Sequence, residues 1–329
     1  MSCCILCPKS ESSAFFGLRL CVFACIIAFG AARRHGRGAW VGNMDENIGI
    51  IKEKLLSSFR FYAVGEGHSI VRHIRDLRSN SKPNPEKQFV AEGIWINKLL
   101  DSAGLRLRAV LLCPDLIRTA EVAALARRLC EKCDQGFTVS EKAFAKIAEK
   151  ERPDGLLSVA YLPQYSFEDL RFGPKSVVLV LDGVEIPGNV GTMMRVADGA
   201  GLDAVLICNR KARMTHPKLI QASMGSLFTL PFAEFADGDA CCDALEKAGF
   251  EIYLTDSRAQ RAYYEYPYGG KTAFVMGSER YGISEAWYSR NVKLLSIPMF
   301  GNCDSLNVGV AATVVSYEAS LKNKGLLKR

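Results

Sequence analysis

Three polar segments follow predicted strands in the second half of the chain, and they hold the residues that could do chemistry. The first, "GVEIPGNVGTMMRVADGAG", contains Asn189 and Arg195, and the second, "VMGSERYGIS", contains Glu279. The third, "IPMFGNCDSLNVGVA", contains Ser305 and Asn307. Open α/β sheets bind their ligands beyond the carboxyl ends of the strands. These five residues are therefore the candidate site.

The first segment begins like a nucleotide-binding strand and turn but lacks the glycines of that motif. A dinucleotide loop needs G-x-G-x-x-G, which "GVEIPGNVG" does not supply, so a nucleotide-dependent oxidoreductase is a disfavoured rival. Asn189 is suited to capping a helix N-terminus. Arg195 lies in an otherwise apolar helix, where an arginine needs a carboxylate, a phosphate or a partner chain. Taken alone, each residue is more often structural than catalytic.

The other two segments are also ambiguous when each is taken alone. Glu279 lies between Gly277 and Gly282, and this spacing alone predicts only a turn. Ser305 is a natural N-cap for the last predicted helix. Capping explains such residues more often than catalysis does, so only their combination points to a site.

The elements that must position these segments alternate between strands and helices. Apolar runs with almost no alternation predict buried strands at 176–182, 203–208, 251–256, 272–277 and 292–299. Helices are predicted between and after them at 189–200, 216–224, 240–248, 284–290 and 305–321. This order predicts a parallel sheet covered on both faces.

The first half of the chain predicts a smaller α/β domain with a largely parallel sheet. It begins with an amphipathic helix over 69–80, whose outer faces carry Arg72, Arg75 and Arg78. Strands and helices then alternate up to a turn-rich connection over 164–174. We expect a domain over 44–165, a second over 166–329, and a non-structural extension or mis-called start over 1–43.

Composition and cysteine usage favour a cytosolic protein with an anionic partner. Of the 329 residues 49% are apolar, and the net charge of +7 suits nucleic acid without proving it. The 12 cysteines form no disulfide framework, and reduced thiols are preferred over a zinc or redox role for Cys130 and Cys133. Residues 20–32 are apolar but too short for a membrane helix. The preferred interpretation is a true start at Met44 preceded by an over-extended reading frame, and a signal or membrane anchor remains the alternative.

Together the three polar segments resemble, in order and spacing, the signature motifs of the SpoU (TrmH-like) branch of the SPOUT RNA 2′-O-ribose methyltransferases. The amino-terminal half resembles the small RNA-binding domain that often precedes the catalytic domain in that family, through "VRHIRDLRSNSKPNPEKQFVAEGIWI" and "VSEKAFAKIAEKERPDGLLSVA". The resemblance covers roughly residues 69–321. It implies a carboxyl-terminal parallel-sheet domain with a deep trefoil knot, a feature that spacing alone does not suggest.

The resemblance also implies a cofactor, partners and site residues. S-adenosylmethionine would be held by the knot loops at Gly277, Ile297 and Leu306, with Thr255 as a weaker candidate. The partners would be RNA and a second copy of the chain, with no metal and no membrane. The catalytic residues that the resemblance implies are Asn189, Arg195, Glu279, Ser305 and Asn307.

The roles that the resemblance implies follow the chemistry of methyl transfer. A free guanidinium is essentially never deprotonated, so Arg195 is expected to bind the adjacent phosphate and the developing alkoxide, beside the other subunit's cofactor. Glu279 is expected to position Arg195 or Asn189. Ser305 and Asn307 are expected to anchor the loops or the target ribose.

Some features leave alternatives open. Gly309 departs from the serine that is common in the family, which puts a secondary contact in doubt. The aromatic and basic stretch 253–271 is either an RNA contact or a surface loop. Ribosomal RNA is favoured over transfer RNA as substrate, and a catalytically inactive RNA-binding knot protein remains the rival from another functional class.

Overall fold

The computed structural model describes residues 39–327. The chain divides into two units, Met1–Ile50 and Ile51–Arg329, and helix α2 (Ala39–Ser58) runs across the division. Residues 1–38 of the predicted extension lie outside the described part, and residues 39–43 belong to α2. The second unit contains two sheets, so two α/β layers follow one another along the chain. The domain boundary near residue 166 stays a prediction.

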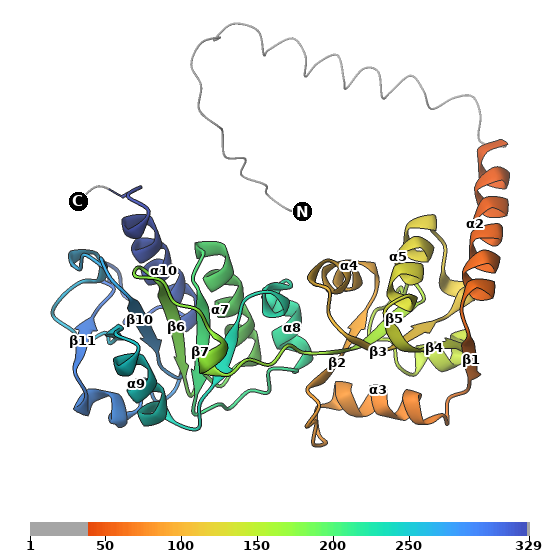
Figure 1. Ribbon diagram of the computed structural model, residues 1–329. Helices are drawn as coiled ribbons and strands as arrows, with labels where there is room; N and C mark the ends of the chain where they lie inside the picture. Colours follow the sequence, from red (N-terminus) through yellow and green to blue (C-terminus); the bar gives the residue numbers. More distant parts are fainter. Residues whose placement is uncertain (1–38, 328–329) are drawn as a thin grey trace, which may run out of the picture. The chain divides into compact units, whose positions relative to one another are not determined.

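The first sheet has the strand order β1-β4-β3-β5-β2. Its strands are β1 (Phe61–Val64), β2 (Gln88–Glu92), β3 (Leu107–Leu112), β4 (Cys133–Val139) and β5 (Leu156–Tyr161). Helix α3 (Ser69–Ser79) covers one face, and α4 (Ile94–Ala103) and α5 (Ala120–Cys130) cover the other (Figure 1). After β4 comes the short helix α6 (Glu141–Ala145).

One strand of the first sheet runs against the others. β5 is antiparallel to both β3 and β2, whereas the pairs β1–β4 and β3–β4 are parallel. The expected largely parallel sheet is therefore confirmed, and β5 is the strand that departs from it. Its direction could not be predicted because a strand buried on both faces has the same apolar pattern in either direction.

The second sheet has the order β11-β9-β10-β6-β7-β8, and every neighbouring pair is parallel. Its strands are β6 (Val177–Asp182), β7 (Ala204–Cys208), β8 (Phe232–Glu234), β9 (Glu251–Thr255), β10 (Thr272–Met276) and β11 (Val292–Leu295). Helices α7 (Pro187–Ala200), α8 (Pro217–Ser223) and α10 (Val308–Asn323) cover one face, and α9 (Gly238–Lys247) covers the other (Figure 1).

Alternate residues of the second sheet enter opposite cores, which confirms the prediction of a parallel sheet covered on both faces. Leu179 and Leu181 of β6 pack in the cluster that includes α7, α8 and α10, whereas Val178 and Val180 pack in the cluster that includes α9. The chain leaves β6 toward β7 and β8 and returns on the other side through β9 and β10. Such a reversal of strand order creates a crevice at the carboxyl ends of the strands.

The structure corrects two predicted caps at this edge. Helix α7 begins at Pro187 and is preceded by Ile186, so Asn189 lies in its first turn and is not the N-cap. Proline at the first helical position starts the helix early because its φ angle is already helical. Helix α10 begins at Val308, and its N-cap is Asn307 and not Ser305.

Other differences concern short elements. The helix expected at 284–290 is the 3-10 turn η5 (Glu285–Ser289), and the strand expected at 292–299 ends at Leu295. Pro298 has no N–H to give to a neighbouring strand, which is consistent with the early end. The short strands β1 and β8 were not predicted, because so few residues establish no periodicity.

Candidate active site

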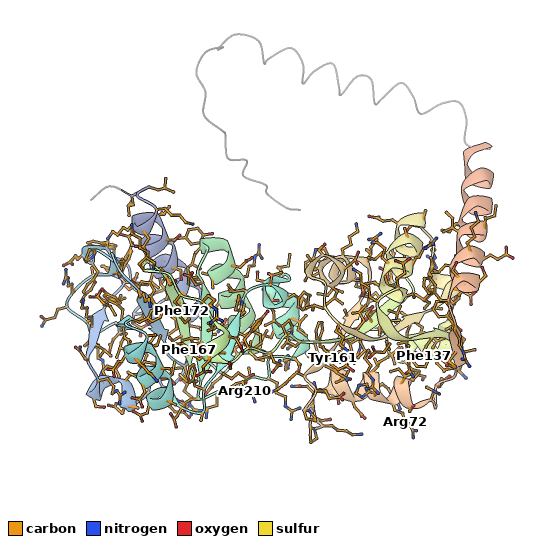
Figure 2. All side chains as sticks on the ribbon, in the orientation of Figure 1. Arg72, Phe137, Tyr161, Phe167, Phe172 and Arg210 are labelled. Carbon is orange, nitrogen blue, oxygen red and sulfur yellow. The ribbon has the colours of Figure 1, made fainter. Side chains whose placement is uncertain are left out.

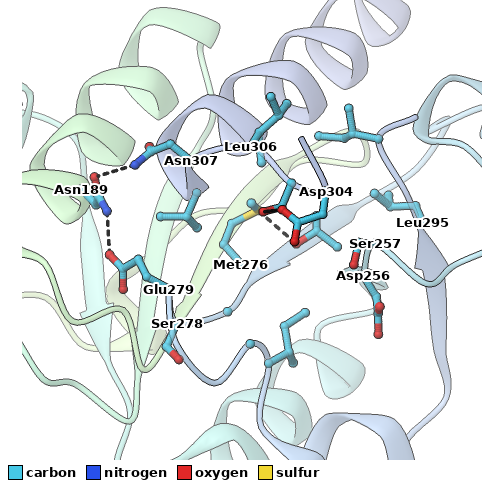
Figure 3. Close-up of a pocket in the computed structure, with 18 of the residues that line it drawn as sticks. Asn189, Asp256, Ser257, Met276, Ser278, Glu279, Leu295, Asp304, Leu306 and Asn307 are labelled. Atoms are coloured by element: carbon cyan, nitrogen blue, oxygen red, sulfur yellow. Dashed lines mark hydrogen bonds between the residues drawn. The ribbon is translucent and has the colours of Figure 1, made fainter. Parts of the chain in front are cut away.

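A cavity of about 520 Å³ opens at the carboxyl ends of β9 and β10 (Figure 3). Its size is typical of small-molecule sites. The predicted site residues that line it are Asn189, Thr255, Gly277, Glu279, Ile297, Ser305, Leu306 and Asn307. The remaining one, Arg195, does not line it. The structure thus brings the three polar segments together around one hollow.

A chain of hydrogen bonds links the three segments across this hollow. Asn189 Nδ2 donates to Glu279 Oε1 at 2.6 Å, and Asn307 Nδ2 donates to Asn189 Oδ1 at 3.3 Å. Asn307 Oδ1 in turn accepts from the Gly309 N–H at 2.9 Å. Figure 3 shows Asn189 between the other two side chains. Each segment therefore contributes one member of a continuous chain.

The two ends of this chain fix the orientation of both amides. An ionised carboxylate can only accept, and a backbone N–H can only donate. Asn189 must therefore turn its nitrogen to Glu279, and Asn307 must turn its oxygen to the Gly309 N–H. The site is organised before any ligand arrives.

Glu279 accepts hydrogen bonds from the backbone of the first segment as well as from the Asn189 side chain. Its Oε2 accepts from the Glu185 N–H at 3.0 Å, and its Oε1 accepts from the Ile186 N–H at 3.4 Å. Burial disfavours the charged carboxylate, but the donors at Glu185, Asn189 and Ile186 outweigh it, so the pKa of Glu279 lies below its ordinary value. Glu279 is consequently an anion at neutral pH.

A second carboxylate makes the reciprocal connection. Asp182, at the end of β6 and only 2% exposed, accepts from the Ser284 N–H at 2.7 Å and from Asn209 Nδ2 at 2.6 Å. The end of β6, directly before the first segment, thus holds the backbone of the second segment through Asp182, while the second segment holds the backbone of the first through Glu279. Removal of Asp182 leaves partly buried donors unpaired, which is costly, whereas the donors to Glu279 are exposed and can turn to water.

Gly277 is required by close packing. A Cβ atom at this position would lie 2.2 Å from the Gly282 carbonyl carbon and 2.3 Å from the Ile283 nitrogen. The turn is closed by Ser278 N–H to Gly282 O at 2.9 Å and the reverse bond at 3.1 Å. No side chain fits at Gly277, so the backbone itself forms the cavity wall there.

The loop after β9 supplies a further anchored carboxylate. Asp256 accepts from Arg258 Nη2 and from Tyr288 Oη, both at 2.8 Å. The Arg258 guanidinium, opposed by burial, holds the pKa of Asp256 well below its usual range. Burial, followed by the Asp256 carboxylate, raises the pKa of Tyr288 to about 12. Thr255 Oγ1 donates to the Val275 carbonyl at 2.8 Å, which fixes the strand end that borders the cavity.

The third segment forms the outer wall. Ser305 is exposed and donates to the carboxylate of its neighbour Asp304 at 3.2 Å. Leu306 is 37% exposed, and Ile297 is half-buried against the core. These residues line the cavity without contacting the Asn189 chain. The anchoring role expected of Ser305 is therefore confined to its own loop, whereas Asn307 joins the segments directly.

Arg195 lies apart from the cavity. It is exposed on α7, and its guanidinium makes no hydrogen bond or ion pair with any side chain or backbone group of residues 48–327. Since it is six residues after Asn189, the helical rotation turns it to a different face of α7. The structure does not place Glu279 against Arg195; the partner of Glu279 is Asn189.

The composition of the cavity wall reveals residues that the motifs did not single out. Asp256, Ser257 and Asp304 line it, as do the apolar side chains of Met276 and Leu295. Asp256 is the last residue of the strand predicted at 251–256, so the strand-end rule that found the three segments could also have found it. The wall includes three carboxylates, from Asp256, Glu279 and Asp304, and its lining contains no lysine or arginine.

Comparison with known proteins agrees with this geometry. Residues 176–317 match the model of the SpoU rRNA Methylase family, and residues 68–158 match the model of the MRM3-like substrate binding domain. The chain is 33% identical over 183 residues to the 23S rRNA (guanosine(2553)-2′-O)-methyltransferase RlmP of Bacillus subtilis, covering 56% of this chain and 71% of that protein. This chain belongs to the SpoU rRNA methylase family. The recognised resemblance is thereby confirmed.

Further relatives extend the SpoU comparison. The 23S rRNA (uridine(2479)-2′-O)-methyltransferase of Streptomyces viridochromogenes is 30% identical over 180 residues, covering 53% of this chain and 63% of that protein. A solved RNA 2′-O ribose methyltransferase is 27% identical with a TM-score of 0.66, covering 80% and 99% of the two chains. An rRNA methyltransferase from Sinorhizobium meliloti, 23% identical over 82% and 99% of the chains, shares the fold with a TM-score of 0.71.

Two remaining expectations concern metals and membranes. Among the described residues, no cluster of three or more His, Cys, Asp or Glu side chains could hold a metal ion. Cys130 and Cys133 are free thiols. Over residues 39–327, no helix is long and apolar enough to cross a membrane.

Proposed function

We propose that this SpoU-family chain transfers the methyl group of S-adenosylmethionine to a ribose 2′-OH of ribosomal RNA. The observation that carries the proposal is the wall of the cavity, which has three carboxylates, one of them paired with Arg258, and no lysine or arginine among its lining residues. Such a wall suits a ligand with a sulfonium and an ammonium charge, and it disfavours the pyrophosphate of a dinucleotide. Apolar side chains at Met276, Leu295 and Ile297 offer contact to an uncharged ring.

The residues of this chain can hold such a cofactor at defined positions. The backbone at Gly277 leaves no side chain between the turn and the cavity, and Leu306 and Ile297 flank it on the outer side. When bound, the cofactor supplies an electrophilic methyl group. The chain's own task is then to align the ribose oxygen with that methyl and to exclude water, and alignment is worth several kcal/mol, about 7–11 in well-oriented systems.

The Asn189 chain is proposed to fix the floor on which the ribose is aligned. Its amides cannot reorient without losing a partner, so they present a constant surface to the substrate. Glu279 is the anchor of this chain and not the proton acceptor, because burial is outweighed by the donors at Glu185, Ile186 and Asn189, which lower its pKa and so make it a weaker base.

Arg195 is proposed to act in the site of a second copy. It has no partner within its own described chain, and a guanidinium beside a phosphate and a developing alkoxide would stabilise both. The neighbouring surface is apolar: Val310 is 49% exposed and Tyr317 is 42% exposed on α10, which packs against α7. A homodimer through α7 and α10 would cover these side chains and bring Arg195 to the partner's cavity.

Ribosomal RNA is proposed over transfer RNA because two relatives carry 23S rRNA in their names and the first half of the chain matches a substrate-binding model. The deep knot, the cytoplasmic location and the domain limits at 44–165 and 166–329 remain predictions. The inactive RNA-binding protein is the other candidate, but an intact chain from Glu279 to Asn307 favours an enzyme.

A complementation experiment tests the arrangement. Arg195→Ala and Gly277→Val chains are each inactive if Arg195 and the Gly277 turn are both needed. Co-refolded mixtures should regain a substantial fraction of methyl transfer, because a mixed dimer holds one complete site. No regain, with mixed dimers demonstrated by two affinity tags, would place Arg195 in its own site or outside catalysis.

Binding of the cofactor can be tested separately. S-adenosylhomocysteine should raise the melting temperature of the wild-type chain, and NAD should not. Stabilisation by NAD alone would favour the rival oxidoreductase and contradict the proposed chemistry.

A further inference from the structure

A second hollow, of about 540 Å³, lies on the first sheet between its edge strand β1 and helix α3. Its lining residues are Tyr62, His68, Ser69, Ile70, His73, Arg108, Gln135 and Phe137. Phe137 and Ile70 form its floor, since both are buried in the core beneath α3. The hollow is separate from the active-site cavity and shares no lining residue with it.

Aromatic rings line one side of this hollow. Tyr62 is 44% exposed, and its ring lies 6.1 Å from that of Phe137, which in turn lies 5.7 Å from the His68 ring. The Arg60 guanidinium lies 5.2 Å from the centre of the Tyr62 ring. An exposed ring backed by other rings and by a guanidinium is the arrangement on which an unpaired base stacks.

Two arginines next in sequence to residues that line or border the hollow are not neutralised by the part of the chain that the structure describes. Arg60 and Arg72 are exposed and make no ion pair or side-chain hydrogen bond among the described residues. Figure 2 shows Arg72 on the side of α3 that faces away from the sheet, with Phe137 on the inner side. Arg108 pairs with Glu86 at 3.6 Å, but its Nε is buried and has no hydrogen-bond partner.

The carboxylates nearby are already engaged. Asp76 is bound to Lys82 at 2.8 Å, and Glu66 pairs with Lys142 at 3.3 Å. Glu86 accepts from Gln88, whose other side-chain atom contacts His73 at 2.6 Å. The local excess of charge is therefore positive, which is complementary to a phosphate backbone.

The hollow continues along α3. A smaller hollow of about 220 Å³ shares His73 with it and is lined further on by Asp76, Asn80, Lys82 and Pro83. An extended strand can follow such a groove, whereas a single small molecule would occupy only one part of it. The surface formed by Arg60, Tyr62, His68, Arg72 and Arg108 is called here the α3 surface.

We propose that the α3 surface binds a single-stranded segment of the RNA substrate, with one base stacked on Tyr62 and phosphates near Arg60 and Arg72. The inference rests on the proposed function and adds to it the location and the manner of RNA binding. A double helix is disfavoured because its bases are stacked on one another and leave no free base face for Tyr62.

The test measures RNA affinity by fluorescence anisotropy with the full chain. The probes are a fluorescein-labelled 12-nucleotide single-stranded RNA of mixed sequence and a hairpin duplex of the same length. Tyr62→Ala should weaken binding of the single strand about tenfold to a hundredfold, since stacking on one aromatic ring is worth about 1–3 kcal/mol. Tyr62→Phe keeps the ring and should bind within twofold of wild type, about 0.4 kcal/mol by the same energy scale.

Charge reversal gives an independent readout. Arg60→Glu with Arg72→Glu should weaken binding at least tenfold and lower the slope of log affinity against log salt by about 2, one for each lost phosphate contact. The matched control reverses Arg118 and Arg127, exposed arginines in and before α5 on the opposite face of the sheet. Thermal melting checks that each variant is folded.

Several outcomes overturn the proposal. They are equal weakening by the control pair, unchanged affinity in Tyr62→Ala, and no preference of the wild type for the single strand. Methyl transfer by the wild-type chain is measured separately. If transfer occurs while the variants bind RNA normally, the proposal for the α3 surface is wrong and the proposed function stands. If transfer fails while Tyr62→Ala loses affinity, the proposed function is wrong and the RNA-binding role of the α3 surface stands.

Discussion

The active-site cavity and the α3 surface both carry polar side chains, but these are hydrogen-bonded to one another around the cavity and largely unpaired on the α3 surface. Around the cavity, Glu279, Asn189 and Asn307 satisfy one another in a chain that permits one orientation. On the α3 surface, Arg60, Arg72 and Tyr62 are exposed, and neither arginine forms an ion pair with another of the described residues. The difference teaches that catalysis requires side chains whose geometry is fixed before the substrate binds. Binding of a flexible strand instead requires charged groups without an ion-pair partner and exposed aromatic rings.

The largest loss of cofactor affinity is expected from a side chain added at Gly277, where the cavity wall is closely packed. Gly277→Ala places a Cβ 2.2 Å from the Gly282 carbonyl carbon, so the turn must move. We expect the affinity for S-adenosylhomocysteine to fall more than tenfold and the free energy of unfolding to fall by about 1–3 kcal/mol. Calorimetric titration and urea unfolding measure the two. Gly301→Ala is the control, because nothing lies within 4 Å of its added Cβ; equal losses in both variants would contradict the packing argument.

Interruption of the polar chain should have the next largest effect. Asn189→Ala removes a donor to the Glu279 carboxylate and leaves Asn307 Nδ2 without its acceptor. Loss of these bonds predicts a fall in kcat/KM of about 10- to 100-fold, with RNA affinity unchanged. Initial rates of methyl transfer and anisotropy measure the two quantities. Asn291→Ala, at an exposed asparagine, is the control and should retain wild-type rates. A parallel loss of RNA affinity in Asn189→Ala would contradict the assignment of catalysis to the cavity and of RNA binding to the α3 surface.

The charge of Glu279 gives a smaller and pH-dependent effect. The folded pKa of Glu279 lies below the unfolded one, so its stabilisation is present above the unfolded pKa, about 4.3, and is lost as the pH falls through the folded value. The stability difference between wild type and Glu279→Gln should be largest at neutral pH and should shrink below about pH 4. Because Glu279 is exposed, we expect about 1 kcal/mol or less.

Urea unfolding at several pH values measures this difference. A difference that grows toward acid pH would show that the folded pKa is raised, and the account of Glu279 as a hydrogen-bonded anion would be wrong. The α3 surface predicts no such dependence for Arg72→Gln, since the arginine remains charged over the whole range.

The smallest effect is expected at the departure from the family pattern. In Gly309→Ser the added Cβ lies 3.2 Å from Thr192 Cγ2 and 3.3 Å from Asn307 Oδ1, so both must yield slightly. Replacement of a helical glycine stabilises the helix by up to about 1 kcal/mol, which offsets the cost of displacing these two side chains. Turnover should therefore stay within about threefold, or 0.7 kcal/mol, of wild type. A tenfold loss would show that the Asn307 contact tolerates no displacement.

The sequence predicted much of the second sheet because its apolar runs and strand ends are distinctive. The rule that ligands bind at strand ends located residues from all three segments before any contact was known. The pairing of Asn189 with Glu279 could not be predicted, because it joins positions 90 residues apart and depends on which helix turn each amide occupies. Capping statistics instead gave the wrong role to Asn189 and Ser305.

The first half was less predictable in its functional detail. The basic face of α3 was visible in the helical periodicity, and its helix ends close to the expected residue. Tyr62 was not singled out, because β1 is too short to show a period and its exposure depends on its place at the sheet edge. Edge position is a property of topology, which a short sequence pattern does not contain.

The most direct test of the central claim is transfer of the tritiated methyl group of S-adenosylmethionine by the purified chain. The substrates are ribosomal and transfer RNA from cells that lack the gene, and digestion to nucleosides identifies the modified group. We expect the label in a 2′-O-methylated nucleoside of ribosomal RNA, with loss of the label in Asn189→Ala and Arg195→Ala. Label in a base-methylated nucleoside, or none in any RNA, would contradict the account.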